Sequence, residues 1–308
     1  MAVFMVGVYP AQPREPWSVR VHRTGRIGHA PPMGIILVGT AGWADRELTA
    51  SGWYPPGTRT PAQRLAHYAS RFGLVEADSP YYAIPTPAVV QRWADSTPDG
   101  FVMDVKAFSA LTGHPGRVHP RDPELAWQRF HEALAPLRTA GRMGRVLLQF
   151  PPWCTAGPHW EQRVGEALDR CRPLPAAVEF RHPSWFADPQ RRGRTLEYLR
   201  SRDAAHVCVD MPKGHPGAVP PLLAATSSTA VVRLHGHSED WIGGSKEDRF
   251  RYTYSDRELA LWADRLSELA AQADEVHAVL NTCCAGEAQR AAEALRRLLP
   301  AHGSASAG

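Results

Sequence analysis

From residue 35 onward, short apolar segments alternate with longer amphipathic ones. The short segments are five to seven residues long and rich in β-branched or other apolar side chains, which is typical of strands. They predict eight strands, at 35–40, 74–79, 101–107, 146–150, 176–181, 206–210, 230–235 and 276–281. Apolar residues spaced three and four apart predict helices at 61–71, 87–95, 123–137, 159–171, 189–202, 256–271 and 287–299. Between the sixth and seventh strands only a short helix, 220–225, is indicated.

Several predicted helices begin with a residue pair that favours a helix start. Ser, Thr and Asp side chains accept hydrogen bonds from the first turn, and Pro is favoured there because it has no N–H group to leave unpaired. Such pairs stand at Thr60-Pro61, Thr86-Pro87, Asp122-Pro123, Asp188-Pro189 and Ser255-Asp256. They support the helix starts independently of the periodicity.

Eight alternating strand and helix units predict a single-domain α/β fold of the TIM type, a (β/α)8 barrel. A doubly wound open sheet is the alternative, but the first strand leads into GTAGWA (39–44), which lacks the GxGxxG phosphate-binding pattern. We expect the barrel to span 34–300 and 301–308 to be a flexible tail. Residues 1–33 are rich in Pro and Arg, so we expect them to be disordered or a mis-assigned extension, with Met33 as the true start.

The charged residues of the strands follow the two-residue alternation of a strand. In the fifth strand Val178 and Phe180 share one face, while Glu179 and Arg181 share the other, which we expect to point to the barrel axis. The same assignment places further polar residues inward: Glu76 with Asp78, Asp104 with Lys106, Cys208 with Asp210, Arg233 with His235, and Gln149 and Asn281. Most lie near the carboxyl ends of their strands, where enzymes of this architecture carry their chemistry.

Burying so many charges costs several kcal/mol per ion unless they are paired or meet water or a ligand. The concentration of charge therefore favours a functional site at the carboxyl ends of the strands. A layer of mutually satisfied ion pairs in the barrel core is the structural alternative, and for any single residue the two interpretations stay open.

The residue types indicate distinct roles at such a site. Lys106, Arg181 and Arg233 would bind an anionic group, because guanidinium and ammonium groups match phosphate and carboxylate. The candidate catalytic residues are acids and bases suited to proton transfer, or to holding a divalent cation: Glu76, Glu179, Asp210 and His235. His114 is either a proton shuttle or a solvated loop residue.

Aromatic and amide residues complete the candidate set. Tyr82 and Trp185 lie in loops after strands, where they could stack on a sugar or a base, or simply close the rim of the barrel. Asn281, at the end of the last strand, is a further candidate for substrate binding. By strand parity His182 lies opposite Glu179, so we expect it to support the loop that carries Trp185.

Composition and charge argue against several classes of protein. The formal net charge is +4, but residues before Met33 contribute four Arg and one Glu, so the body is close to neutral and a generally basic nucleic-acid surface is not indicated. Five cysteines without CxxC spacing favour reduced thiols in a cytoplasm. No apolar run is long enough to span a membrane. The zinc-binding motif HExxH is absent, so the sequence does not identify a metal.

The sequence also resembles the YecE-like family, or domain of unknown function 72, over 35–299. The matching blocks are VGTAGW (38–43), Tyr54-Pro55, VEADSPYYAIP (75–85), VKAFSALTGH (105–114), LLQFPP (147–152), VEFRHPSW (178–185), VRLHG (232–236) and YSDRELALWADRL (254–266). The resemblance implies a TIM barrel and leaves the activity open. It also implies that the candidate residues within these blocks recur in the family.

This chain departs from the pattern that the resemblance implies. Asp78 stands where the family usually has Asn, and Thr282 and Ala291 replace further Asn residues, with Cys283 and Cys284 following Thr282. If those amides contact a ligand, the specificity or activity of this chain is altered.

Two hypotheses follow for the function. The first is an enzyme that acts on an anionic phosphorylated or sugar-containing small molecule with carboxylate and histidine acid–base chemistry, with or without a divalent metal as its cofactor; a hydrolase is one such enzyme. The second is a non-catalytic barrel that binds a phosphorylated metabolite or the phosphates of a nucleic acid. Substrate and oligomeric state are left open.

Overall fold

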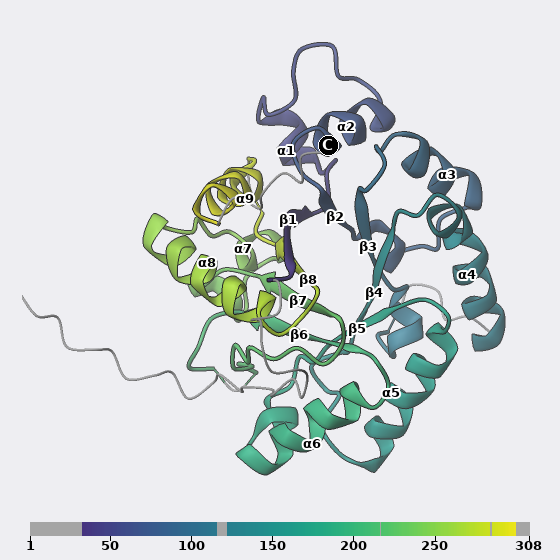
Figure 1. Ribbon diagram of the computed structural model, residues 1–308, viewed down its shortest axis with the longest axis vertical. Helices are drawn as coiled ribbons and strands as arrows, with labels where there is room; N and C mark the ends of the chain where they lie inside the picture. The colour runs from purple at the N-terminus through teal and green to yellow at the C-terminus, as the bar shows by residue number, and fades with distance from the viewer. Residues whose placement is uncertain (1–32, 116–121, 216, 284, 300–308) are drawn as a thin grey trace, which may run out of the picture.

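Eight parallel strands close into a barrel with the helices outside it, in a computed structural model that describes residues 33–115, 122–215, 217–283 and 285–299 (Figure 1). The strand order around the barrel is the sequence order, which confirms the predicted TIM-type fold. The strands are β1 (Ile35–Ala41), β2 (Leu74–Ala77), β3 (Val102–Lys106), β4 (Met143–Gln149), β5 (Ala176–Glu179), β6 (Ala205–Asp210), β7 (Thr229–Leu234) and β8 (Glu275–Leu280). The proposed start at Met33, the rest of the extension 1–33 and the tail 301–308 remain predictions, because 1–32 and 300–308 lie outside the described residues.

The helices pack their apolar faces on the strands. They are α1 (Arg46–Ala50), α2 (Pro61–Ala69), α3 (Pro87–Asp95), α4 (Pro123–Thr139), α5 (Pro158–Cys171), α6 (Pro189–Arg200), α7 (Lys246–Arg249), α8 (Asp256–Ala270) and α9 (Glu287–Leu298). Capping side chains accept from the first turn at Thr60, Asp122, Asp188 and Ser255, as their sequences predict, whereas Thr86 caps α3 without a side-chain hydrogen bond.

The predicted helix at 220–225 does not form. Pro220 and Pro221 open this stretch, and a residue that precedes proline is disfavoured in the helical region. The segment instead runs as buried irregular chain, with His206 Nε2 of β6 placed 3.1 Å from the carbonyl oxygen of Leu222. It covers β6 where a helix would otherwise pack.

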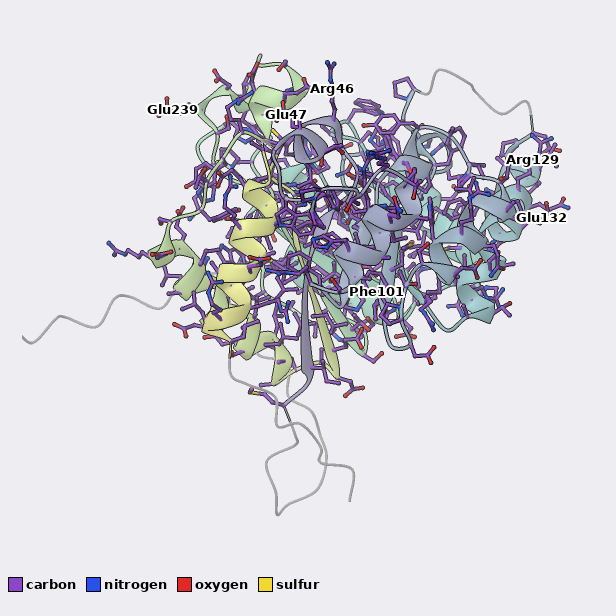
Figure 2. The ribbon with its side chains drawn as sticks, turned by 90° about the horizontal axis from the view of Figure 1, so that it is seen from above. Arg46, Glu47, Phe101, Arg129, Glu132 and Glu239 are labelled. Carbon is purple, nitrogen blue, oxygen red and sulfur yellow. The ribbon has the colours of Figure 1, made fainter. Side chains whose placement is uncertain are left out.

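The loops at the carboxyl ends of the strands gather at one end of the barrel. Figure 2 shows Arg46 and Glu47 of α1, which follows β1, at the same end as Glu239 of the 3₁₀ helix η4 (Glu239–Trp241), which follows β7. Three other loops carry a 3₁₀ turn at this end: η1 (Ser79–Tyr81), η2 (Ser109–Thr112) and η3 (Pro183–Phe186). These loops surround the strand ends at which the charged residues lie.

The register between strands decides which side chains point inward. Gln149 pairs with Glu179 across β4 and β5, so both share the inner face. Val209 pairs with Arg233 across β6 and β7, and Asp210 pairs with Leu234. Because Arg233 points inward, Asp210 and Cys208 point outward, which makes their predicted inward placement wrong.

A second buried polar group fills the amino-terminal half of the barrel. His277 of β8 lies with Nδ1 2.8 Å from Asp104 Oδ2 and with Nε2 hydrogen-bonded to Glu275. Asp104 also accepts from the backbone N–H of Arg145 at 2.6 Å. Burial alone would lower the pKa of His277, but the two carboxylates outweigh it and raise the pKa to about 9.

We predict that His277 stabilises the fold in a pH-dependent way. Its folded-state pKa lies above its ordinary value of 6.5, so its contribution is complete below about pH 6.5 and is lost as pH rises through about 9. Urea unfolding should show that His277→Gln lowers the free energy of unfolding by about 3 kcal/mol at pH 6 and by much less at pH 9.5. An equal loss at both pH values would contradict a charged His277.

Candidate functional site

Three charges from different strands form a buried triad, defined here as Glu76, Arg233 and Glu179. Arg233 donates from Nε to Glu76 Oε2 at 2.9 Å and from Nη2 to Glu76 Oε1 at 2.6 Å. Its Nη1 donates to Glu179 Oε2 at 2.6 Å. No side chain of the three is more than 1% exposed, so water does not screen the attraction. The guanidinium joins β2, β5 and β7 across the barrel axis.

Glu179 has its second oxygen occupied as well. Oε1 accepts from Gln149 Nε2 at 2.7 Å and from Arg181 Nη1 at 2.8 Å. A carboxylate that accepts charged hydrogen bonds at both oxygens is held in its ionised form and is a weak base toward a substrate. Glu179 therefore fixes Arg181, whose side chain is 17% exposed, at the carboxyl end of the barrel.

The two glutamates of the triad differ in proton affinity. Burial raises the pKa of Glu76 above its ordinary range, and Arg233 only partly offsets it. Burial also acts on Glu179, but Arg233, His235 and Arg181 together outweigh it and hold the pKa of Glu179 well below its ordinary value. Glu179 is thus the permanently ionised member, and Glu76 is the member that takes up a proton first.

His235 lies fully buried beside the triad. Its Nδ1 is 2.8 Å from Asn281 Nδ2, and its Nε2 is 3.4 Å from Glu179 Oε1. Burial lowers the pKa of His235 to about 4, so the ring is neutral near pH 7. Nε2 also lies 3.3 Å from Arg181 Nη1, so the ring contacts Asn281, Arg181 and Glu179 at the base of the site.

Lys106 lies on the inner face of β3, near the end of the strand. Its Nζ is 3.8 Å from Asp78 Oδ1 and 4.6 Å from the centre of the Tyr81 ring, a cation–π contact. The Lys106 side chain is 14% exposed. Lys106 and Arg181 are thus the predicted substrate-binding cations that reach solvent, whereas Arg233 does not.

His114 is drawn into the same region. Thr112 Oγ1 donates to the carbonyl of Ser109 at 3.2 Å and lies 3.0 Å from His114 Nδ1. The hydroxyl can donate to either group, and the tautomer in which Nδ1–H donates to Thr112 carries its lone pair on Nε2. Burial, together with the charges of Lys106 and Arg181, lowers the pKa of His114 to about 4. Both cations thus act electrostatically on the same ring.

Aromatic rings lie beside both cations. Tyr81, which contacts Lys106, forms an edge contact with His114, and His114 forms one with Trp153, with ring centres 5.4 and 5.9 Å apart. Trp241 of η4 faces the Arg181 guanidinium, 5.4 Å from its carbon to the ring centre. Flat faces next to cations suit a ligand that combines an anion with a ring.

The other predicted site residues lie apart from this group. Trp185 is 1% exposed, stacks on Phe180 at 4.0 Å and donates from Nε1 to the carbonyl of Cys154, so its predicted place in the mouth is wrong. The turn η3 folds it against the outer face of β5. Asp210 points outward and accepts from Trp262 Nε1 at 3.3 Å, also outside the barrel. Tyr82 stands at the rim, 62% exposed and edge-on to Tyr81.

His182 has the supporting position that its parity predicted. Its Nδ1 accepts from the backbone N–H of Ser184 at 3.2 Å and caps η3, the turn that carries Trp185. Sequence reasoning underrated His114 and gave no site role to Gln149 or Trp153. The parity of Gln149 was visible, but nothing in the sequence showed which loop aromatics face the cations.

A metal between the triad glutamates does not fit this arrangement. The Arg233 guanidinium already occupies the space between Glu76 and Glu179, where a divalent cation would need carboxylate oxygens. Within the described ranges, no group of three or more His, Cys, Asp and Glu side chains is arranged to hold a metal ion. Nor is any helix there long and apolar enough to cross a membrane.

Two cavities lie away from the barrel end. One of about 470 Å³ is lined by Ser70, Arg71, Glu293, Arg296 and Arg297, between α2 and α9. The other, of about 350 Å³, lies between α5 and α6. Neither cavity thus contains the buried charged residues of the barrel end. We base the candidate site on the chemistry, because the charged groups of the larger cavity lie at exposed helix ends.

Comparison with known proteins places the chain in a family. The model of the family described as "Protein of unknown function DUF72" matches residues 37–307. The UPF0759 protein YunF of Bacillus subtilis is 32% identical over 262 residues, which cover 82% of this chain and 91% of YunF. YecE of Escherichia coli is 30% identical over 180 residues, 57% of this chain and 59% of YecE.

Solved structures agree with this assignment. A DUF72 family protein of Thermotoga maritima matches with a TM-score of 0.74 and 28% identity, over 86% of this chain and 98% of that one. A DUF72 family protein of Enterococcus faecalis matches with a TM-score of 0.78 and 24% identity, over 86% and 95%. With its matched family model, its aligned relatives and its eight-stranded barrel, the chain belongs to the DUF72 family, whose curated relatives here carry the name UPF0759.

Proposed function

We propose that the carboxyl end of the barrel is the active site of an enzyme for a small anionic substrate, whose charged group is bound by Lys106 and Arg181. The observation that carries this proposal is the ionised Glu179. Its Oε1 accepts from Arg181 and directs that side chain outward, while its Oε2 accepts from the buried Arg233. Fixed donors at a partly dry site bind anions far better than flexible surface lysines do. Phosphate esters and carboxylates both fit this pair.

Proton transfer in this proposal falls to His114 and not to Glu179. Glu179, Glu76 and His235 are at most 1% exposed and serve to position the groups above them. His114 is only partly buried and keeps the Nε2 lone pair. An anion bound at Lys106 and Arg181 offsets two of the charges that depress the pKa of His114. Binding therefore moves this base toward the pH range in which general bases work.

The aromatic rings indicate the rest of the substrate. Tyr81 contacts Lys106, and Trp241 contacts Arg181. A sugar or an aromatic ring joined to the anion would stack on them. A phosphorylated or carboxylated small molecule with a ring is thus the substrate class that this arrangement supports, and hydrolysis is one reaction open to it.

We predict that anion binding depends on the two partly exposed cations. Calorimetric titration with inorganic sulfate, whose charge is constant across the pH range used, should show at least tenfold weaker binding for Lys106→Met and for Arg181→Met. Arg71→Met, in the cavity between α2 and α9, is the matched control and should bind as the original protein does. Binding that is lost only in the Arg71 variant would place the anion in that cavity.

Asp78 should weaken the same binding. Its carboxylate lies 3.8 Å from Lys106 Nζ and competes with an incoming anion for that charge. We predict that Asp78→Asn tightens sulfate binding about two- to fivefold in the same titration, the size expected for a partly exposed charge pair. Weaker binding in this variant would show that Asp78 holds Lys106 in its binding position.

We predict that sulfate raises the pKa of His114. NMR titration of the histidine ring signals, with His114 assigned by its loss in His114→Gln, should give a pKa near 4 without sulfate and a clearly higher one at saturation. The sign follows because a bound anion favours the charged imidazolium. An unchanged pKa with sulfate bound would exclude His114 from the site.

A further inference from the structure

Asp210, which points outward, contacts three side chains outside the barrel. Its Oδ2 accepts from Tyr254 Oη at 2.7 Å and from Trp262 Nε1 of α8 at 3.3 Å. Its Oδ1 lies 2.8 Å from His237 Nε2. The Asp210 side chain is 4% exposed, so this network is well shielded from water. One carboxylate at the end of β6 thus fastens the segment after β7 and the helix behind it.

His237 is held between two carboxylates. Opposite Asp210, its Nδ1 lies 3.5 Å from Glu258 Oε1 of α8. Glu258 is itself fixed, because it accepts from Tyr252 Oη at 2.6 Å and completes the capping box with Ser255. The imidazole therefore links β6 to the start of α8, and each of its two nitrogens faces an acid.

The chain between these anchors reaches the candidate active site. We define the Trp241 loop as residues 236–255, which run from the end of β7 to α8. Gly236 begins it with a φ of +81°, and a Cβ there would lie 2.4 Å from Tyr252 Cβ, so only glycine permits this close return of the loop. Beyond the bend, Trp241 contacts Arg181 and lies 6.1 Å from the His235 ring.

We propose that Asp210 and His237 are positioning residues that hold Trp241 against Arg181 and so set the anion affinity of the site. The effect on affinity rests on the proposed function, whereas the placement of Trp241 is independent of it. Both residues act through the Trp241 loop, since Asp210 lies on the outer side of the barrel. Anchoring at the loop's two ends leaves Trp241 as the part that reaches inward.

The charge on His237 makes this positioning depend on pH. The groups that face it are Asp210 of β6, Glu258 of α8, Tyr252 and Tyr254 of the loop, and the more distant Lys213 after β6. The hydrogen bond to Asp210 is the largest influence and raises the pKa of His237 above 6.5. Charged His237 thus persists above pH 6.5, and its attraction to both acids is lost as pH rises through the raised pKa.

The first test needs no ligand. The fluorescence of Trp241, taken as the difference between each protein and its Trp241→Phe derivative, is followed from pH 5 to pH 9. We expect a transition with a midpoint above 6.5 that is absent in His237→Gln, which can keep one hydrogen bond but has no charge. His131→Gln on α4 is the control and should retain the transition. The same transition in His237→Gln would overturn the proposal.

The second test measures sulfate affinity in the same proteins. At pH 6, His237→Ala and Asp210→Asn should weaken binding about 3- to 10-fold, the size typical of residues that act through an intervening element. His237→Gln should recover part of the loss and remove the pH dependence that the original protein shows between pH 6 and 9. Glu76 can also titrate between pH 6 and 9, so Glu76→Gln is measured as well. The part of the pH dependence that His237 causes should persist in this variant.

The outcomes separate the two proposals. If Lys106→Met abolishes binding while the His237 and Asp210 variants bind normally, the site stands and the positioning role is overturned. If the original protein binds no sulfate, the proposed anion site fails, and the Trp241 transition alone decides whether His237 places the loop. Far-UV circular dichroism of each variant excludes unfolding as the cause of a loss.

Discussion

The buried guanidinium of Arg233 is the constraint on which the rest of the barrel end depends. Removing three charges from water costs several kcal/mol for each ion, and the arrangement repays this only through close, well-aligned hydrogen bonds. Arg233 uses Nε and both terminal nitrogens for such bonds, with two directed at Glu76 and one at Glu179. The positions of β2, β5 and β7 relative to one another are therefore fixed, because a shift of one strand would leave a buried charge without its partner.

This constraint also decides what chemistry remains for each residue. Glu179 is held so firmly by donors that it stays ionised and directs Arg181 toward solvent, instead of acting as a free base. The structural alternative raised by the sequence, a satisfied ion-pair layer, thus describes the triad itself. The site chemistry that we propose lies next to it, at Lys106, Arg181 and His114, where side chains are partly exposed and the two cations act on the His114 ring.

Much of the fold could be predicted from the sequence because its signals are local. Apolar runs and helix starts depend on neighbouring residues, and all eight strands and seven long helices lie close to their expected positions. Strand parity failed at β6 for a physical reason. Alternation shows that Cys208 and Asp210 share a face, but only the register with β7 shows that this face points outward. The presence of a charged residue therefore did not show which face of the strand points into the barrel.

The site could be predicted only in part for the same reason. Lys106, Arg181 and Glu179 lie on strands, where parity carries the information. Trp185 and Trp241 lie in loops, and a 3₁₀ turn buries the first behind β5 while another brings the second over Arg181. Such turns depend on contacts across the whole molecule, which no local pattern contains.

We propose that Arg181, fixed by the buried triad, and Lys106 form one anion site at the barrel end. This proposal is tested most directly by a crystal structure with selenate, whose anomalous scattering locates the anion without ambiguity. We expect a selenate peak within hydrogen-bonding distance of both Lys106 Nζ and the Arg181 guanidinium, with Glu179 still bound to Arg233. A peak confined to Arg71, Arg296 and Arg297, with none at the barrel end, would contradict it.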